Sequence, residues 1–158
     1  MRALESLARL CAVLAGVLMT LITLITCVSL TGRNLAGVTL AGDFELTGVA
    51  TGAAVALFLP WCQARRGNII VDFFTAKAGE RTNALLDRLG ALLLALVMLL
   101  LSWRTTLGGM NAWNTNSGTM MLGFPEWVVY AAMVPPLLLT ALIGLAQAAR
   151  GFPEEGPQ

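Results

Sequence analysis

The sequence contains no histidine, and this absence removes several kinds of site at once. A chain without imidazole cannot form a Ser-His-Asp or Cys-His active site, and it cannot bind zinc, copper or haem through histidine. Cys11 and Cys27 are separated by about 24 Å along one expected helix, and the three cysteines show no metal-ligand spacing. We therefore expect no catalytic residue, no cofactor and no metal site, and we do not expect an enzyme.

Charge is also scarce. Only 12% of the 158 residues are charged, against about 25% in an ordinary soluble domain. The net charge of +1 argues against nucleic acid as a partner. In contrast, 57% of the residues are hydrophobic, and the mean hydropathy is +0.76. Such a chain cannot cover a water-facing surface, so its main surroundings are expected to be membrane lipid.

The charges leave four long uncharged stretches. They predict membrane spans at about 10–32, 44–64, 85–103 and 127–149, each near the 20 or so apolar residues that a membrane helix needs. The first span exceeds the apolar region of a typical signal peptide, so we expect it to be retained. We predict a single all-α four-helix membrane domain over 1–150 and a disordered cytoplasmic tail over 151–158.

The basic residues predict how these spans are oriented. With both chain ends in the cytoplasm, eight of the ten Lys and Arg side chains lie inside and two lie outside. Such an excess is typical of cytoplasmic loops. The two outer ones are Arg33 and Arg104, the latter placed at the start of an outer loop over 104–126. The sequence therefore predicts a multi-pass protein with its N- and C-termini inside.

The membrane interior is expected to be a packing surface, because no ionisable residue lies at a span centre. Hydroxyls in the first span can bond back to their own helix. Gly48 and Gly52 form a GxxxG pattern in the second span, and Gly144 with Ala148 repeats small-xxx-small spacing in the fourth. This spacing allows close helix contact, within the chain or with a partner.

Polar features gather instead at the two membrane faces. On the outer side, Glu45 lies just inside the second span, where it can anchor the helix start or contact a partner. Ion pairs among Arg33, Asp43, Glu45 and Arg104 are expected near the headgroups. Pro125 fits the first turn of the fourth helix, and Trp127 fits an interfacial anchor.

On the inner side, a stretch from Arg65 to Phe74 connects the second and third spans. Its apolar residues recur at positions that share one face of a helix, which predicts a short amphipathic segment in the interface or against another subunit. The polar residues that we assign to this segment are Arg65, Arg66, Gly67, Asn68 and Asp72.

Together these features resemble the small permease subunit (DctQ family) of tripartite ATP-independent periplasmic (TRAP) transporters. The resemblance rests on Arg33 after the first helix, Glu45 opening a Gly- and Ala-rich second helix, the stretch from Arg65 to Asp72, and the Pro125–Trp127 entry to the last helix. It spans about residues 5–150. The family often has histidine where this chain has Asn68, so that position cannot need an ionisable side chain here.

The resemblance implies a subunit of a secondary active transporter in the bacterial inner membrane. Such subunits pair with a large (DctM-like) permease that holds the substrate and sodium sites, and they brace its stationary scaffold. A periplasmic (DctP-like) binding protein delivers an organic acid, and the sodium gradient drives symport. The implied partners are these two proteins and membrane lipid.

The residues leave other classes open. One is a small four-helix membrane enzyme of the glutathione-transferase type, whose site Arg65, Arg66 and Arg88 would line. Another is a small multidrug exporter, which needs a mid-helix carboxylate, whereas Glu45 lies near a helix end. A third is the small subunit of another tripartite carboxylate transporter. The candidate interface residues are Arg33, Glu45, Gly48, Gly52, Arg65, Arg66, Gly67, Asn68, Asp72, Phe73, Pro125 and Trp127.

Overall fold

Four long helices make up the computed structural model, which describes residues 2–37, 41–65 and 80–150. The helices are α1 (Arg2–Ala36), α2 (Asp43–Ala64), α3 (Glu80–Thr115) and α4 (Trp127–Arg150). All four are long and apolar enough to cross a membrane, and the described residues form no strand. The predicted all-α, four-span fold is therefore confirmed, whereas the orientation with both ends inside stays a prediction.

The predicted spans agree closely with α2 and α4, but α3 is much longer than predicted. It continues to Thr115, so the first half of the predicted outer loop at 104–126 is helical and that prediction was wrong. Threonine, asparagine and glycine suggested a loop there. In the folded chain, however, the hydroxyls of Thr106 and Thr115 donate to the carbonyls of Ser102 and Asn111, four residues earlier in the same helix.

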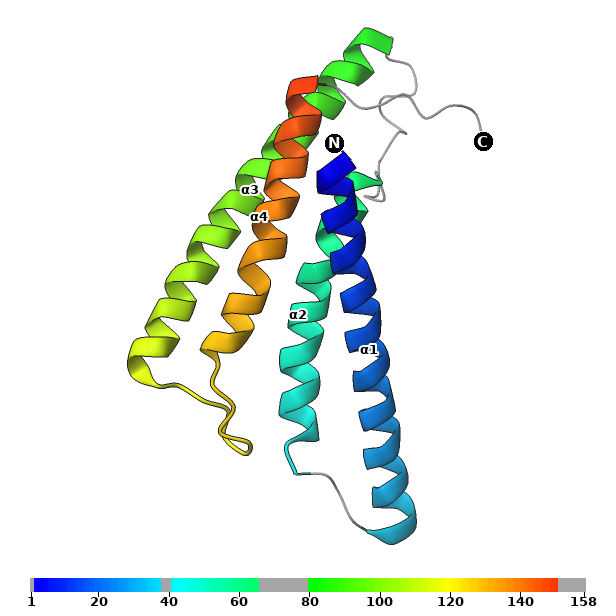
Figure 1. Ribbon diagram of the computed structural model, residues 1–158, viewed down its shortest axis with the longest axis vertical. Helices are drawn as coiled ribbons and strands as arrows, with labels where there is room; N and C mark the ends of the chain where they lie inside the picture. Colours follow the sequence, from blue (N-terminus) through cyan, green and yellow to red (C-terminus); the bar gives the residue numbers. More distant parts are fainter. Residues whose placement is uncertain (1, 38–40, 66–79, 151–158) are drawn as a thin grey trace.

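The helices stand side by side in a row rather than in a closed bundle (Figure 1). Along this row the order is α1, α2, α4, α3, and each helix packs against its neighbour in that order. Among the described residues α3 contacts neither α1 nor α2. Along the helix axes, the start of α1 and the end of α4 lie at the same end of the molecule, which we call the terminal end. The end of α1 and the connection between α3 and α4 lie at the opposite end, which we call the loop end.

Small side chains hold the row together. Ala91 and Ala95 of α3 are buried against α4, where a Cβ on Gly144 would lie 3.1 Å from the Ala91 carbonyl oxygen. Buried alanines also fill the core of α2. Close backbone approach of this kind is how membrane helices gain packing contacts in lipid. Most large apolar side chains of the described residues consequently stay exposed.

Threonines of α1 do not form a polar path. The hydroxyls of Thr20, Thr23 and Thr26 donate to the carbonyls of Gly16, Met19 and Ile22, at 2.8, 2.8 and 2.9 Å. Each hydroxyl is thus bonded within its own helix, as the sequence suggested.

Candidate interface sites

At the loop end, the carboxylate of Glu45 fastens the α3–α4 connection to the start of α2. Its Oε1 accepts from the Met121 N–H at 2.9 Å, and its Oε2 accepts from the Leu122 N–H at 3.2 Å. Gly42, in the left-handed conformation with φ 79°, precedes this helix, and a Cβ there would overlap the Leu122 side chain. Glu45 therefore contacts another part of its own chain, a role that its position in the sequence did not reveal.

Asp43 performs a similar task between α1 and α2. Its Oδ2 accepts a hydrogen bond from the buried Ser29 hydroxyl of α1, and its Oδ1 accepts from the Phe44 N–H at 2.7 Å. The ion pairs expected here do not form: within the described part of the chain, Arg33 and Arg104 make no salt bridge to Asp43 or Glu45. Hydroxyl and amide donors bind the two carboxylates instead, and Arg33 acts on Asp43 only at longer range, through its charge.

An apolar tip surrounds the Glu45 contact. We define this loop-end tip as Phe44, Met120, Met121 and Leu122. Met120 is fully exposed, Phe44 is 85% exposed and Met121 is 72% exposed. Four large apolar side chains displayed together at a helix-loop junction are typical of a surface that another protein or the membrane interface covers.

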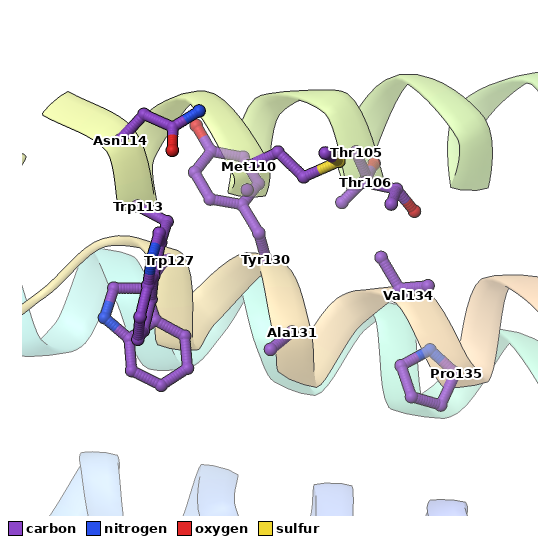
Figure 2. Close-up of a pocket in the computed structure, with 11 residues that line it drawn as sticks. Thr105, Thr106, Met110, Trp113, Asn114, Trp127, Tyr130, Ala131, Val134 and Pro135 are labelled. Atoms are coloured by element: carbon purple, nitrogen blue, oxygen red, sulfur yellow. The ribbon is translucent and has the colours of Figure 1, made fainter.

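A cavity of about 390 Å³ lies between α3 and α4 near the loop end. Figure 2 shows Trp113 and Trp127 at one end of it, Val134 and Pro135 at the other, and Tyr130 reaching from α4 toward α3. The two indole rings meet edge to face, with centroids 4.8 Å apart. No charged side chain lines this cavity. Its walls therefore suit an apolar group better than a carboxylate substrate.

A buried amide pair links α2 to α4 at the terminal end. Gln63 Nε2 donates to Gln147 Oε1 at 2.7 Å, and Gln147 Nε2 donates to the backbone carbonyl oxygen of Gln63 at 3.0 Å. The two residues are 5% and 3% exposed. The placement of charged residues along the sequence did not reveal this pair, because neither glutamine is charged. Two glutamines near the same predicted membrane face were the available signal.

The predicted interface glycines and arginines fall in different surroundings. A Cβ on Gly48 or Gly52 would meet nothing within 4 Å, so this GxxxG makes no close contact in the described chain, unlike Gly144. Arg33 is exposed at the end of α1. Arg65 follows α2, and its guanidinium lies 4.8 Å from the centre of the Trp61 ring.

Pro125 lies in the turn that leads into the last helix, where its carbonyl oxygen accepts from the Val128 N–H at 3.2 Å, and not in the first turn of the helix itself. It forms an isolated bridge with Gly118, and α4 starts two residues later at Trp127. The residues outside the described ranges include several other candidates and all of the predicted amphipathic segment after Arg65. These candidates are Arg66, Gly67, Asn68, Asp72 and Phe73.

Comparison with known families decides the class of protein. The profile of the DctQ component of tripartite ATP-independent periplasmic transporters matches residues 22–154. This chain belongs to the DctQ family. The match covers α2, α3 and α4 completely, together with the second half of α1. No curated protein and no solved structure matches the chain.

Membership in the DctQ family settles the broad alternatives. The family is a transporter component and not an enzyme family, which rejects the membrane transferase. It also identifies the tripartite system as the TRAP type and the chain as its small membrane component. As a component of a tripartite transporter, a DctQ protein has partners in the membrane. The loop-end tip, the cavity and the open GxxxG face are among the surfaces that the described residues offer them.

Proposed function

We propose that this chain is the membrane brace of a TRAP transporter in the bacterial inner membrane. It pairs with a large (DctM-like) permease and holds its scaffold while the sodium gradient drives uptake of an organic acid. A periplasmic (DctP-like) protein delivers the acid. The substrate and sodium sites lie in the large permease, so this chain needs no cofactor of its own.

The observation that carries this proposal is the open row of helices. α1 and α3 bury few of their large side chains against the rest of the chain, and thirty-three large apolar residues stay exposed over the described ranges. In lipid the hydrophobic effect does not drive helices together, so membrane helices associate through packing and polar contacts. A row of this shape therefore offers broad faces to a larger membrane protein. The loop-end tip suits the periplasmic side, where the binding protein arrives.

The test is a comparison of assembly and uptake. The tagged chain is purified gently from its native membranes, and co-purifying proteins are identified by mass spectrometry. Proteoliposomes then receive the chain alone, the large permease alone, or both, each with the binding protein and a sodium gradient. We expect the permease to co-purify, and we expect uptake only where both membrane proteins are present.

Two outcomes would contradict the proposal. Uptake by the chain alone would make it a transporter in its own right. Recovery of the chain without any polytopic partner, from membranes that contain the permease, would remove the bracing role. A sodium ionophore serves as the control for the energy source, because it should abolish uptake without changing the assembly.

A further inference from the structure

Arg104 lies in the part of α3 that packs along α4, although its own side chain is exposed. The two helices contact each other on both sides of it: Gly108 lies against Tyr130, and Ala95 lies against Gly144. Trp113 and Trp127, which contact each other at the loop end, mark the interfacial level expected of tryptophan. Counting nine residues from Trp113 places Arg104 about 13 Å deeper along the helix.

The opposite boundary is marked by Arg88, sixteen residues and about 24 Å away along α3. Between Arg88 and Trp113, Arg104 is the one charged residue of α3, and α4 has none between Trp127 and Arg150. A third span that ended at 103 would place Arg104 at the headgroups. Because α3 continues to Thr115, we place Arg104 within the membrane instead.

The direction of the Arg104 side chain keeps its guanidinium away from the headgroups at the loop end. Side chains on an α-helix lean toward its N-terminus. Because α3 starts at the terminal end, the Arg104 side chain leans toward the middle of the membrane. Arg104 is exposed, and it makes no hydrogen bond or ion pair with the part of the chain that the structure describes. A charge at this depth is costly unless a partner neutralises it.

Arg104 belongs to a regular stripe on the side of α3 opposite α4. We define the α3 edge stripe as Leu93, Val97, Leu100, Arg104, Leu107 and Asn111, all of them exposed. Their spacing alternates between four and three residues. This is the heptad spacing by which one helix packs along another, and a polar residue in such a seam fixes register and partner.

We infer that the α3 edge stripe docks on a membrane helix of the large permease that presents a carboxylate to Arg104. A second copy of this chain is the wrong occupant: a two-fold axis along the membrane normal would bring Arg104 opposite Arg104 and would leave like charges facing each other. An acidic residue on a different protein neutralises the guanidinium, and the apolar stripe residues pack around the pair. This inference rests on the proposed function and adds the helix, residue and chemistry of the contact.

The first experiment compares complexes purified from membranes that contain wild-type chain, Arg104→Gln or Arg104→Lys. Loss of one buried polar partner in a membrane typically costs enough for about a tenfold loss of bound permease. We expect that loss for Arg104→Gln and near wild-type recovery for Arg104→Lys. All three isolated chains should melt at the same temperature, because Arg104 has no described partner within the chain.

The second experiment locates the contact. A photo-crosslinking amino acid at Leu100 should give an adduct with the permease, and the same probe at Leu92, an exposed residue of α3 off the stripe, should not. In Arg104→Lys, a membrane-soluble carbodiimide should join the introduced amine to the partner's carboxylate. The amide bond forms as the carbodiimide takes up the water and becomes a urea. Peptide mapping then names the acidic residue, and Arg104→Gln is the control that should give no adduct.

Each other outcome has a defined meaning. If the wild-type chain brings down no permease, the proposed function fails and the inference fails with it. If the wild-type complex forms and Arg104→Gln matches it, the inference alone is overturned. Crosslinks from Leu92 but not Leu100, or no carbodiimide adduct, also overturn it. Loss of a co-purifying anionic phospholipid, with the permease retained, would assign Arg104 to a lipid phosphate.

Discussion

At the scale of single residues, polar side chains in these helices do two different jobs. Thr20, Thr23 and Thr26 of α1 donate to their own backbone, so their hydroxyl protons are not available for contacts across the row. Glu45, Gln63 and Gln147 instead bond to another element. Because lipid offers no hydrogen-bond partner, polar contacts between elements can fix the arrangement more selectively than apolar packing does.

Replacing Glu45 by alanine should release the α3–α4 connection. The Met121 and Leu122 amides lose the acceptor that they share, so their hydrogen exchange should become markedly faster, as measured by mass spectrometry on the chain in detergent. Glu126→Ala is the matched control at the same end of the row, because its carboxylate does not bind these amides. Equal exchange at residues 121 and 122 in both variants would show that Glu45 does not hold the connection.

The buried glutamine pair should show coupling in a double-mutant cycle. Gln147→Leu removes both hydrogen bonds to Gln63 and should lower stability by about 1–2 kcal/mol, in the range of polar contacts in membranes. In Gln63→Leu the Gln147 amide loses its side-chain partner, and we expect this variant to lose a similar amount of stability. The double variant should cost less than the two single losses together, measured by unfolding in mixed micelles. Strict additivity would mean that the amides do not stabilise each other.

At the scale of elements, the pairing of α3 with α4 depends on glycine and alanine. Gly144 has no free space for a side chain, whereas Gly48 and Gly52 have open space, although both places show the same small-residue spacing. Spacing alone therefore does not tell which motif is used inside the chain. The neighbouring helix decides it.

A leucine at Gly144 should push α3 and α4 apart. Overpacking of this kind typically costs about 1–3 kcal/mol, so the melting temperature of the isolated chain should fall. Gly48→Leu is the matched control, and it should leave the isolated chain unchanged because nothing lies within 4 Å of its Cβ position. A destabilised Gly48→Leu chain together with an unaffected Gly144→Leu chain would contradict this helix arrangement.

At the scale of the whole molecule, the helices stand in an open row (Figure 1). Many large apolar side chains of the described residues are exposed on it, and few are buried. With Arg104 placed in α3, the connection over 116–126 carries no lysine or arginine. The arginine nearest the loop end is then Arg33 in the last turn of α1. This strengthens the charge asymmetry on which the predicted orientation rests.

Reporter fusions test that orientation directly. Fluorescent protein fused after the last residue should fluoresce, and alkaline phosphatase at the same place should be inactive, because basic loops favour the cytoplasmic side. Phosphatase inserted near Gly118 should be active. The reverse pattern would place the loop-end tip in the cytoplasm, and it would remove the tip from any contact with a periplasmic protein.

The sequence by itself determined the membrane class, the four spans and the resemblance to the DctQ family, because these depend on composition, on runs of uncharged residues and on short motifs. It placed the ends of α2 and α4 closely, since charged residues or tryptophan bound them. It failed at the end of α3, where hydroxyls bonded within the helix and contacts with α4 support residues whose composition suggested a loop.

Only the tertiary structure decided which polar residues meet. Glu45 and Met121 lie 76 residues apart, and Gln63 and Gln147 lie 84 apart, so no local pattern connects them. The same is true of Arg104, which lies inside α3, between residues that contact α4, and not in a loop as its neighbours in the chain suggested. Local composition sets whether a segment enters the membrane, whereas helix packing sets which side chains are satisfied there and which still need a partner.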